Sequence, residues 1–276
     1  MVYVHLYQEI KMIKVMNVQA KKRGRPAKQT TVIEFDSSRV KLLRGSELTF
    51  SDELFKPMVT GTELDVIFST DGGLMPGTNM MLAGGPGSGK STIVLDVLAK
   101  LTQQGLKVLF VSGEMDEIAH YKYCKRMPTF ACVQTLFLKN YSENVAETLE
   151  YVFDQGYDVI AIDSIAEVLE MYKDAYRTTE GNAEFWFLNL QDKHKKGDNS
   201  KKYYTTFINI QQMTKSGDFV GSNRLKHMVD AFCHVERSKD GLERSLYFSK
   251  NRDCDKDFKV FFSIYDGSVS YAYEIE

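Results

Sequence analysis

Short apolar runs and segments of helical periodicity alternate through the middle of the chain. Four apolar runs predict buried strands at Asn79–Ala83, Val108–Ser112, Val159–Ile162 and Thr206–Ile210. Apolar residues that recur every three or four positions predict helices at about Lys90–Gln103, Asp116–Arg126, Glu143–Gln155 and Ala183–Lys193. Strands that alternate with helices indicate right-handed crossovers, and therefore an α/β fold with a mostly parallel sheet flanked by helices.

The last quarter of the chain has a different pattern, in which short strands follow one another without helices between them. These strands are predicted at Ala231–Glu236, Arg244–Ser249, Lys259–Ile264 and Ser268–Tyr273. Tight turns are expected at Asp240-Gly241 and Asp266-Gly267. We therefore expect an antiparallel C-terminal edge added to the parallel core.

The N-terminal segment is basic. No acidic residue lies between Glu9 and Glu34, and this composition predicts a disordered tail over residues 1–31 and a globular domain over residues 32–276. The segment 21–28, Lys-Lys-Arg-Gly-Arg-Pro-Ala-Lys, resembles an AT-hook, in which Arg23 and Arg25 would enter the narrow minor groove of A·T-rich duplex DNA. A tail that simply raises the local DNA concentration, or a nuclear-targeting signal, is the alternative.

The overall composition limits the classes of function. The chain has 276 residues, 43% of them hydrophobic, which is enough for one large domain with a core. Its net charge of −2 gives no bulk attraction to polyanions, so contacts with nucleic acid must come from local clusters. The four cysteines are widely separated, which argues against a zinc site and favours a reducing, cytoplasmic setting. No apolar run approaches the ~18 residues of a membrane span, so no membrane partner is expected.

Residues 84–91 match the phosphate-loop (Walker A) pattern G-x-x-x-x-G-K-[ST], with a predicted strand before them and a predicted helix after them. Glycines allow the backbone to wrap closely around a polyphosphate, and the positive end of the following helix faces the phosphates. A glycine-rich turn that matches by chance is the alternative. The motif predicts a site for a nucleoside triphosphate, taken as ATP, formed by Gly84, Gly85, Pro86, Gly87, Ser88, Gly89, Lys90, Ser91 and Thr92.

Two residues of this motif and one strand end are predicted to bind the phosphates and Mg²⁺. Lys90 would reach the β- and γ-phosphate oxygens, and the Ser91 hydroxyl would bind the metal. Asp163 follows the third predicted strand at its carboxyl end, where parallel sheets bind their ligands, so it is predicted to hold Mg²⁺ with Ser91. The alternative role for Asp163 is to cap the next helix.

Three further polar residues follow predicted strands. Hydrolysis of the γ-phosphate requires a group that orients the attacking water and accepts its proton, and Glu114 is the candidate. Pairing with the N-terminus of the helix that begins near Asp116 is the alternative for Glu114. Gln211 and Gln212 follow the fourth strand, where an amide can sense the γ-phosphate. Two adjacent glutamines leave the choice between them open.

Taken together, these segments resemble the RecA superfamily of ATPases, and most closely its RadA (Sms) branch. The resemblance covers roughly residues 60–273. It rests on Thr60-Gly61-Thr62-Glu63-Leu64-Asp65, Gly72-Gly73-Leu74-Met75-Pro76-Gly77, Val111-Ser112-Gly113-Glu114, Ile162-Asp163-Ser164-Ile165, Met213-Thr214-Lys215-Ser216-Gly217, the segment from Gly221 to Asp230, and Lys250-Asn251-Arg252.

The resemblance implies a hexameric ring or filament with ATP at each subunit interface and DNA along its axis, acting in recombination, repair or replication. It also implies that Lys250 and Arg252 reach the γ-phosphate of the neighbouring subunit; a solvated hairpin is the alternative for these residues. The chain departs from the family at Asp253-Cys254, where Phe-Gly is usual. The zinc module and the protease-like domain of the branch are absent from the sequence, a form familiar from bacteriophages, which would place the protein in a host cytoplasm.

Two predicted loops at the carboxyl ends of the strands combine basic and aromatic residues, a mixture that suits single-stranded DNA. One is Met171–Asn182. The other, Thr214–Arg224, carries Lys215, Phe219 and Arg224 and is favoured because the glutamines lead into it. Both are alternatively subunit contacts. A third basic cluster, which we interpret as a solvated turn, contains Lys193, Lys195, Lys196, Lys201 and Lys202.

The sequence therefore predicts a DNA-dependent ATPase that binds single-stranded DNA as an oligomer. Two alternatives remain. A KaiC-type signalling ATPase would share the phosphate loop and the Ser-Gly-Glu strand end but have no role on DNA. A DNA-binding scaffold would use ATP only to assemble.

Overall fold

The computed structural model describes residues 36–213, 223–241, 243–255, 258–265 and 267–273, which fall into two units, residues 1–49 and 50–276. In the first unit, the described residues form two short 3₁₀ turns, Ser37–Arg39 and Gly45–Glu47. The predicted domain boundary after residue 31 lies outside the described residues.

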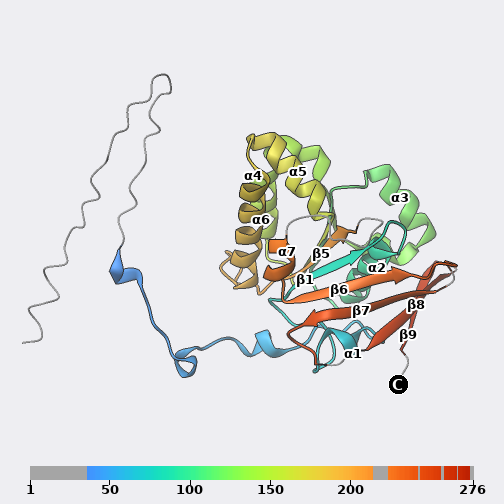
Figure 1. Ribbon diagram of the computed structural model, residues 1–276, viewed down its shortest axis with the longest axis horizontal. Helices are drawn as coiled ribbons and strands as arrows, with labels where there is room; N and C mark the ends of the chain where they lie inside the picture. Colours follow the sequence, from blue (N-terminus) through green and yellow to red (C-terminus); the bar gives the residue numbers. More distant parts are fainter. Residues whose placement is uncertain (1–35, 214–222, 242, 256–257, 266, 274–276) are drawn as a thin grey trace, which may run out of the picture. The chain divides into compact units, whose positions relative to one another are not determined.

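The second unit is built on one nine-stranded sheet with the strand order β3-β2-β4-β5-β1-β6-β7-β8-β9 (Figure 1). The strands are β1 (Asn79–Gly84), β2 (Val108–Ser112), β3 (Thr135–Phe137), β4 (Val159–Asp163), β5 (Thr206–Gln212), β6 (Ala231–Arg237), β7 (Arg244–Asn251), β8 (Lys259–Tyr265) and β9 (Ser268–Tyr273). Strands β3, β2, β4, β5, β1 and β6 run parallel, and β7 to β9 are antiparallel. The predicted α/β fold is confirmed.

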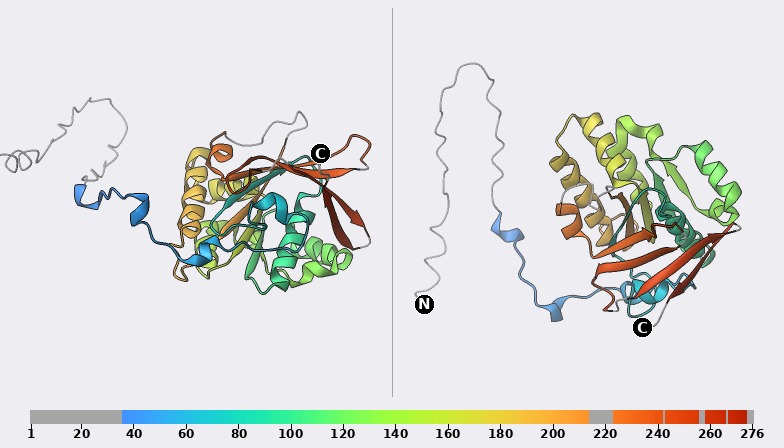
Figure 2. Two further views of the ribbon diagram at one scale, coloured as in Figure 1. Left: turned by 90° about the horizontal axis from the view of Figure 1, so that it is seen from below. Right: turned by 45° about the vertical axis from the view of Figure 1, so that its right-hand side comes forward.

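Helices cover both faces of the parallel strands (Figures 1 and 2). Their bounds are α1 (Asp65–Phe68), α2 (Lys90–Gln103), α3 (Glu117–Arg126), α4 (Val145–Phe153), α5 (Ile165–Tyr176), α6 (Glu180–Lys195) and α7 (Asn223–Met228). Along each strand, side chains alternate between two apolar cores. Met80 and Leu82 of β1 pack with α1 and α2, whereas Met81 and Ala83 pack with α4, α5, α6 and α7. This arrangement holds β1 rigidly, and the phosphate loop follows directly from it.

Strand β6 corrects the predicted architecture. We expected it to begin the antiparallel edge, but Met80 to Gly84 of β1 pair in parallel with Ala231 to Val235 of β6. Antiparallel pairing starts only between β6 and β7. The local sequence of a strand indicates its burial pattern but not the direction of the neighbouring strand. The chain passes from β5 to β6 through α7, and such a helical crossover allows β6 to run parallel to β1.

The prediction that Met171–Asn182 forms a loop is wrong. Most of this segment is helical, because α5 continues to Tyr176 and α6 starts at Glu180. The Tyr172 ring stacks on Trp186 with centroids 4.0 Å apart, and the Tyr176 hydroxyl donates to Glu147. These tyrosines therefore pack helices against one another. The helical spacing of the buried residues Ile165, Val168 and Leu169 was the signal for this helix.

Candidate nucleotide site

The phosphate loop joins the carboxyl end of β1 to the first turn of α2. Gly87 and Gly89 adopt φ angles of +72° and +108°, which side chains disfavour, so glycine is required at both positions. A Cβ atom on Gly84 would lie 2.3 Å from the Val235 carbonyl oxygen of β6, and one on Gly89 would lie 3.1 Å from the Phe262 ring of β8. The loop is therefore pressed against the neighbouring strands, with no room for side chains at these two glycines.

Lys90 lies over this loop and is buried. Its Nζ donates to the carbonyl oxygens of Gly84, at 2.8 Å, and Gly85, at 2.9 Å. Burial lowers the pKa of Lys90, and the negative charges of Asp163 and Glu114 partly oppose that shift. A polyphosphate would supply the negative oxygens that the buried ammonium lacks.

Ser91 and Asp163 meet at the start of α2. The Ser91 hydroxyl donates to Oδ2 of Asp163 at 2.5 Å, although 72 residues separate them in the sequence. Burial raises the pKa of Asp163 to about 6; the nearby Glu114 adds to the rise, and Ser91 and Lys90 oppose it. A hydroxyl and a carboxylate are the hard oxygen donors that Mg²⁺ prefers, so these two residues fit a Mg²⁺ ion that also holds phosphates and water.

Glu114 and Gln212 lie together at the ends of β2 and β5. Gln212 Nε2 donates to Glu114 Oε1 at 3.0 Å. Gln211 is buried, whereas Gln212 is exposed, so the two glutamines that the sequence left equivalent have different surroundings. The first turn of α3 is capped by Asp116, whose side chain accepts from the Ala119 amide at 2.7 Å. Glu114 is thus not needed as that cap.

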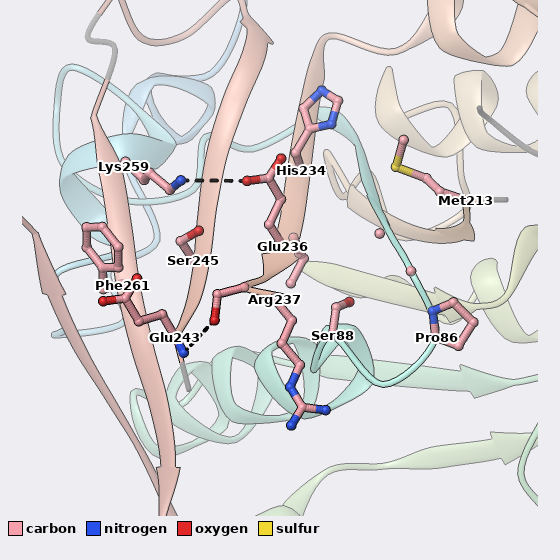
Figure 3. Close-up of a pocket in the computed structure, with 14 residues that line it drawn as sticks. Pro86, Ser88, Met213, His234, Glu236, Arg237, Glu243, Ser245, Lys259 and Phe261 are labelled. Atoms are coloured by element: carbon pink, nitrogen blue, oxygen red, sulfur yellow. Dashed lines mark hydrogen bonds and ion pairs between the residues drawn. The ribbon is translucent and has the colours of Figure 1, made fainter. Parts of the chain in front are cut away.

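A pocket of about 460 Å³ adjoins the phosphate loop on the side of β6, β7 and β8 (Figure 3). Pro86 and Ser88 of the loop face it, together with His234, Glu236 and Lys259 from the strands. Lys259 pairs with Glu236 at 3.6 Å, and the ring of His234 stacks on Tyr247 with centroids 4.9 Å apart. The sequence analysis did not predict His234, Glu236 and Lys259, because in the sequence each looks like an ordinary polar residue on a strand.

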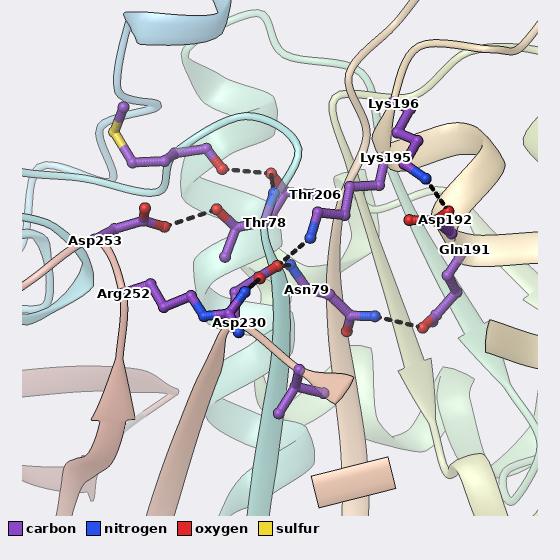
Figure 4. A network of polar contacts seen from close by, with 12 residues as sticks. Thr78, Asn79, Gln191, Asp192, Lys195, Lys196, Thr206, Asp230, Arg252 and Asp253 are labelled. Atoms are coloured by element: carbon purple, nitrogen blue, oxygen red, sulfur yellow. Dashed lines mark hydrogen bonds and ion pairs between the residues drawn. The ribbon is translucent and has the colours of Figure 1, made fainter. Parts of the chain in front are cut away.

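Lys250 and Arg252 lie at the opposite end of the sheet from their own phosphate loop. Asn251 pairs with Ala231, which pairs with Met80 near the amino end of β1. Arg252 donates to Asp230 at 2.9 Å (Figure 4). Lys250 donates to the carbonyl oxygens of His227 and Val229, at the end of α7. Their predicted action on a neighbouring subunit stays a prediction.

Four predicted DNA-contacting residues, Arg23, Arg25, Lys215 and Phe219, lie outside the described residues, and so does the side chain of Arg224. The described residues contain no group of three or more His, Cys, Asp or Glu side chains that could hold a metal ion by themselves. The search of the same residues finds no helix long and apolar enough to cross a membrane.

Comparison with known proteins gives several partial matches. The Zeta toxin family model matches residues 76–179, which include the phosphate loop and Asp163. The DNA repair protein RadA of Campylobacter jejuni is 30% identical over 194 residues, which are 69% of this chain and 40% of RadA. RadA of Mycobacterium tuberculosis is 28% identical over 217 residues, which are 78% of this chain and 43% of that protein. The chain thus spans about two fifths of the length of the curated relatives it matches.

Solved structures agree on the fold. A KaiC-like protein from Pyrococcus horikoshii aligns with a TM-score of 0.58 at 16% identity, covering 79% of this chain and 99% of that one. The flagellar accessory protein FlaH of Methanocaldococcus jannaschii aligns with a TM-score of 0.55 at 14% identity, covering 78% and 96%. With the phosphate loop, the strand order and the RadA matches, these likenesses lead to one conclusion. The chain belongs to the RecA superfamily of P-loop ATPases, as a RadA-like member.

Proposed function

We propose that the protein is a Mg²⁺-dependent ATPase that is stimulated by single-stranded DNA and works as a homo-oligomer in DNA repair or recombination. The observation that carries the proposal is the meeting of Lys90, Ser91, Asp163, Glu114 and Gln212 around one phosphate loop. The similarity to proteins named DNA repair protein RadA supports the DNA role.

Each residue has a defined task in this proposal. Lys90 exchanges its two bonds to loop carbonyls for bonds to the β- and γ-phosphate oxygens. Ser91 and Asp163 would hold Mg²⁺, which would supply positive charge beside the phosphates. Glu114 accepts a hydrogen bond from the attacking water and takes its proton. Its present partner, Gln212, holds the carboxylate in place from the side.

Gln212 rather than Gln211 is the sensor in this proposal. Gln212 is exposed and already bonded to Glu114, and it lies two residues before Thr214–Arg224, the segment that we propose contacts single-stranded DNA through Lys215, Phe219 and Arg224. A γ-phosphate that competes for the Gln212 amide would move the start of that segment. The basic tail, with Arg23 and Arg25, would add an A·T-rich duplex contact.

In the proposed oligomer, a hexamer, each subunit presents two different surfaces to its neighbours. The phosphate loop lies at the carboxyl end of β1, and Lys250 and Arg252 lie near its amino end. Because these sites are at opposite ends of one subunit, a head-to-tail arrangement is the one that brings Lys250 and Arg252 to a neighbour's nucleotide.

The test is phosphate release from ATP with and without a single-stranded oligonucleotide, with Lys90→Ala as the blank. We expect Mg²⁺-dependent turnover that the oligonucleotide increases and that the blank lacks. Turnover that ignores the oligonucleotide, with no binding at low salt, would favour a KaiC-like signalling ATPase. Normal DNA binding and biological function in Glu114→Gln would favour a scaffold that uses ATP only for assembly.

A further inference from the structure

A second concave surface lies at the amino ends of the parallel strands, away from the phosphate loop. This groove has a volume of about 890 Å³. Pro76, Leu106, Asp158 and Tyr204 line it, and they lie one to three residues before β1, β2, β4 and β5, respectively. Strands of five to seven residues put roughly 20 Å between the two ends of the sheet. The groove is therefore separate from the candidate nucleotide site.

One wall of the groove is the turn 199–204, which contains the lysine pair that the sequence suggested was merely solvated. Asn199 is buried at 1% exposure, and its side chain holds the turn from inside. Its Oδ1 accepts from the amides of Lys201, at 3.1 Å, and Tyr203, at 3.0 Å, and its Nδ2 donates to the Tyr203 carbonyl at 2.7 Å. Ser200 bonds Asp154 through both its amide and its hydroxyl, at 3.0 Å each. The turn is fixed to the body of the protein.

The packing of the two tyrosines makes the turn more rigid. A Cβ atom on Gly156 would lie 2.7 Å from the Tyr203 ring, and one on Gly197 would lie 3.0 Å from the Tyr204 ring, so both rings lie tightly on glycine backbone. Lys202 keeps a φ of +59°, which a side chain other than glycine rarely adopts. Such a conformation persists only where the surroundings impose it. Lys201 and Lys202 are consequently presented from a fixed backbone.

The charges of the groove favour an anion. Lys56, Lys201 and Lys202 line it, together with the carboxylates of Glu53 and Asp158. Asp158 already accepts from the Lys107 amide at 2.8 Å, and Glu53 lies 4.0 Å from Lys56. Within the described part of the chain, Lys201 and Lys202 have no ion-pair partner, and both are exposed. Tyr203, 38% exposed, offers an aromatic surface beside them.

We propose that this groove binds single-stranded nucleic acid, with phosphates at Lys201 and Lys202 and a base against Tyr203. Proteins bind single-stranded nucleic acid with exposed lysines next to aromatic rings, because the lysines neutralise the phosphates and any base can stack on the ring. The inference extends the proposed function by adding a second nucleic-acid contact.

The test measures binding of a fluorescent oligothymidylate by anisotropy over a series of salt concentrations. The double variant Lys201→Gln/Lys202→Gln is compared with Lys122→Gln/Lys239→Gln, which removes the same charge from exposed lysines outside the groove. We expect about tenfold weaker binding for the first variant at ~0.1 M salt. Its slope of log affinity against log salt should fall by about 1.4, the value for two lost phosphate contacts. Affinities of the two double variants within twofold of each other would overturn the proposal.

Two further variants separate charge and stacking from folding. Lys201→Arg/Lys202→Arg keeps both charges and should bind like the parent, whereas Tyr203→Leu should weaken binding of single strands more than of duplex. Thermal unfolding of every variant identifies losses that come from misfolding. Displacement of the oligonucleotide by polyglutamate at equal charge concentration would indicate an acidic protein partner and contradict the proposal.

The same experiment distinguishes this inference from the proposed function. Basal ATP turnover without DNA should be unchanged in Lys201→Gln/Lys202→Gln, because the groove is at the far end of the sheet. A parent protein that binds the oligonucleotide through the groove but never hydrolyses ATP would overturn the proposed function alone. A parent protein whose ATP turnover rises with the oligonucleotide, while Lys201→Gln/Lys202→Gln binds that oligonucleotide as tightly as the parent does, would overturn the groove alone.

Discussion

The two ends of the parallel sheet treat their polar groups in opposite ways. At the amino end, Asn79, Gln191 and Asn209 close a ring of side-chain amide hydrogen bonds of 2.7 to 2.9 Å; Figure 4 shows the bond between Asn79 and Gln191. Asp230 beside them accepts from the Asn79 amide and pairs with Lys195 and Arg252. Each of these groups has its partner within the protein, as buried polar groups usually do. The buried His194 ring at the same end is an exception, because neither of its nitrogens has a hydrogen-bond partner among the described residues.

At the carboxyl end, by contrast, charged groups are buried with incomplete compensation. Asp163 is 3% exposed and has a raised pKa, and Lys90 is 8% exposed and has a lowered one. Each shift means that burial destabilises the charged form. Charges held in this way favour the arrival of a ligand of opposite charge, which in the proposed function is a phosphate for Lys90 and a cation for Asp163. Stability and function therefore draw on different ends of the same strands.

The largest effect is expected at the carboxyl end, on turnover. Glu114→Gln removes the proton acceptor while keeping the side-chain shape, so phosphate release should fall about 10²- to 10³-fold with ATP binding retained. The matched control is Glu117→Gln, three residues further along the chain at the start of α3, where the side chain accepts from Asn140. Turnover that drops less than about fivefold in Glu114→Gln would show that another group activates the water.

The next effect is on stability against acid and belongs to the amino end. His194 is fully buried beside Phe153, and neither ring nitrogen has a hydrogen-bond partner among the described residues. Burial lowers the pKa of His194 to about 4; the charge of Lys193 adds to this and that of Asp154 opposes it. Because the folded pKa lies below the ordinary 6.5, the stabilising contribution is present above pH 6.5 and is lost as the pH falls toward 4.

The loss over this range is up to about 3 kcal/mol. Urea unfolding at pH 7, 6, 5 and 4 measures it, and His194→Phe should remove this part of the pH dependence. An unfolding free energy whose pH dependence is the same in His194→Phe and in the parent would contradict the assignment to this ring.

A third variant should stabilise the protein while disabling the site. Burial raises the pKa of Asp163 in the folded protein above its unfolded value of 3.8. The contribution of this group to the stability of the fold is therefore fully present below pH 3.8 and is lost as the pH rises through about 6. Asp163→Asn avoids the buried charge and should stabilise the nucleotide-free protein at pH 8 by about 2 kcal/mol. Thermal unfolding with and without Mg²⁺ and ATP is the measurement. Without ligand, the variant should unfold at a higher temperature than the parent, and Mg²⁺ with ATP should raise its unfolding temperature by less. A variant that unfolds at a lower temperature than the parent without ligand would contradict the contrast between the two ends.

The last effect, equal to the previous one in Asp230→Ala and smaller in Asp230→Asn, concerns the paired charges at the amino end. Asp230→Ala leaves the backbone amide of Asn79 and two cations without their acceptor. The free energy of unfolding should fall by only about 2 kcal/mol, because Arg252 is largely exposed and can form hydrogen bonds to water instead. Asp230→Asn keeps an oxygen for the Asn79 amide and should cost about half as much. Denaturant unfolding gives both values. ATP binding to the single subunit should not change in either variant, and a loss of that binding would mean that the two ends are coupled.

Much of the candidate site follows from the sequence because its parts are local. A glycine-rich turn between a strand and a helix specifies its own backbone, and it needs only the flanking residues of β1 and α2. Glu114 and Asp163 were predictable for a similar reason. Each directly follows a short apolar run, and the parallel arrangement of such strands brings their carboxyl ends to one edge.

Contacts between distant segments decided the rest. The sequence could not distinguish Gln211 from Gln212, because burial on one side of β5 and the bond to Glu114 both depend on neighbouring strands. It also could not reveal that β6 lies parallel to β1. The turn with Lys201 and Lys202 read as a solvated surface, and only its packing on Asp154 and Gly156 shows a fixed wall of a groove.

By itself the sequence determined the phosphate loop, the alternation of strands and helices and the polar strand ends, because each depends on residues that are close together in the sequence. The tertiary structure alone decided strand direction, the partner of each polar side chain and the shape of the second groove. These depend on segments tens of residues apart, whose pairing is set by the packing of the whole sheet and its helices.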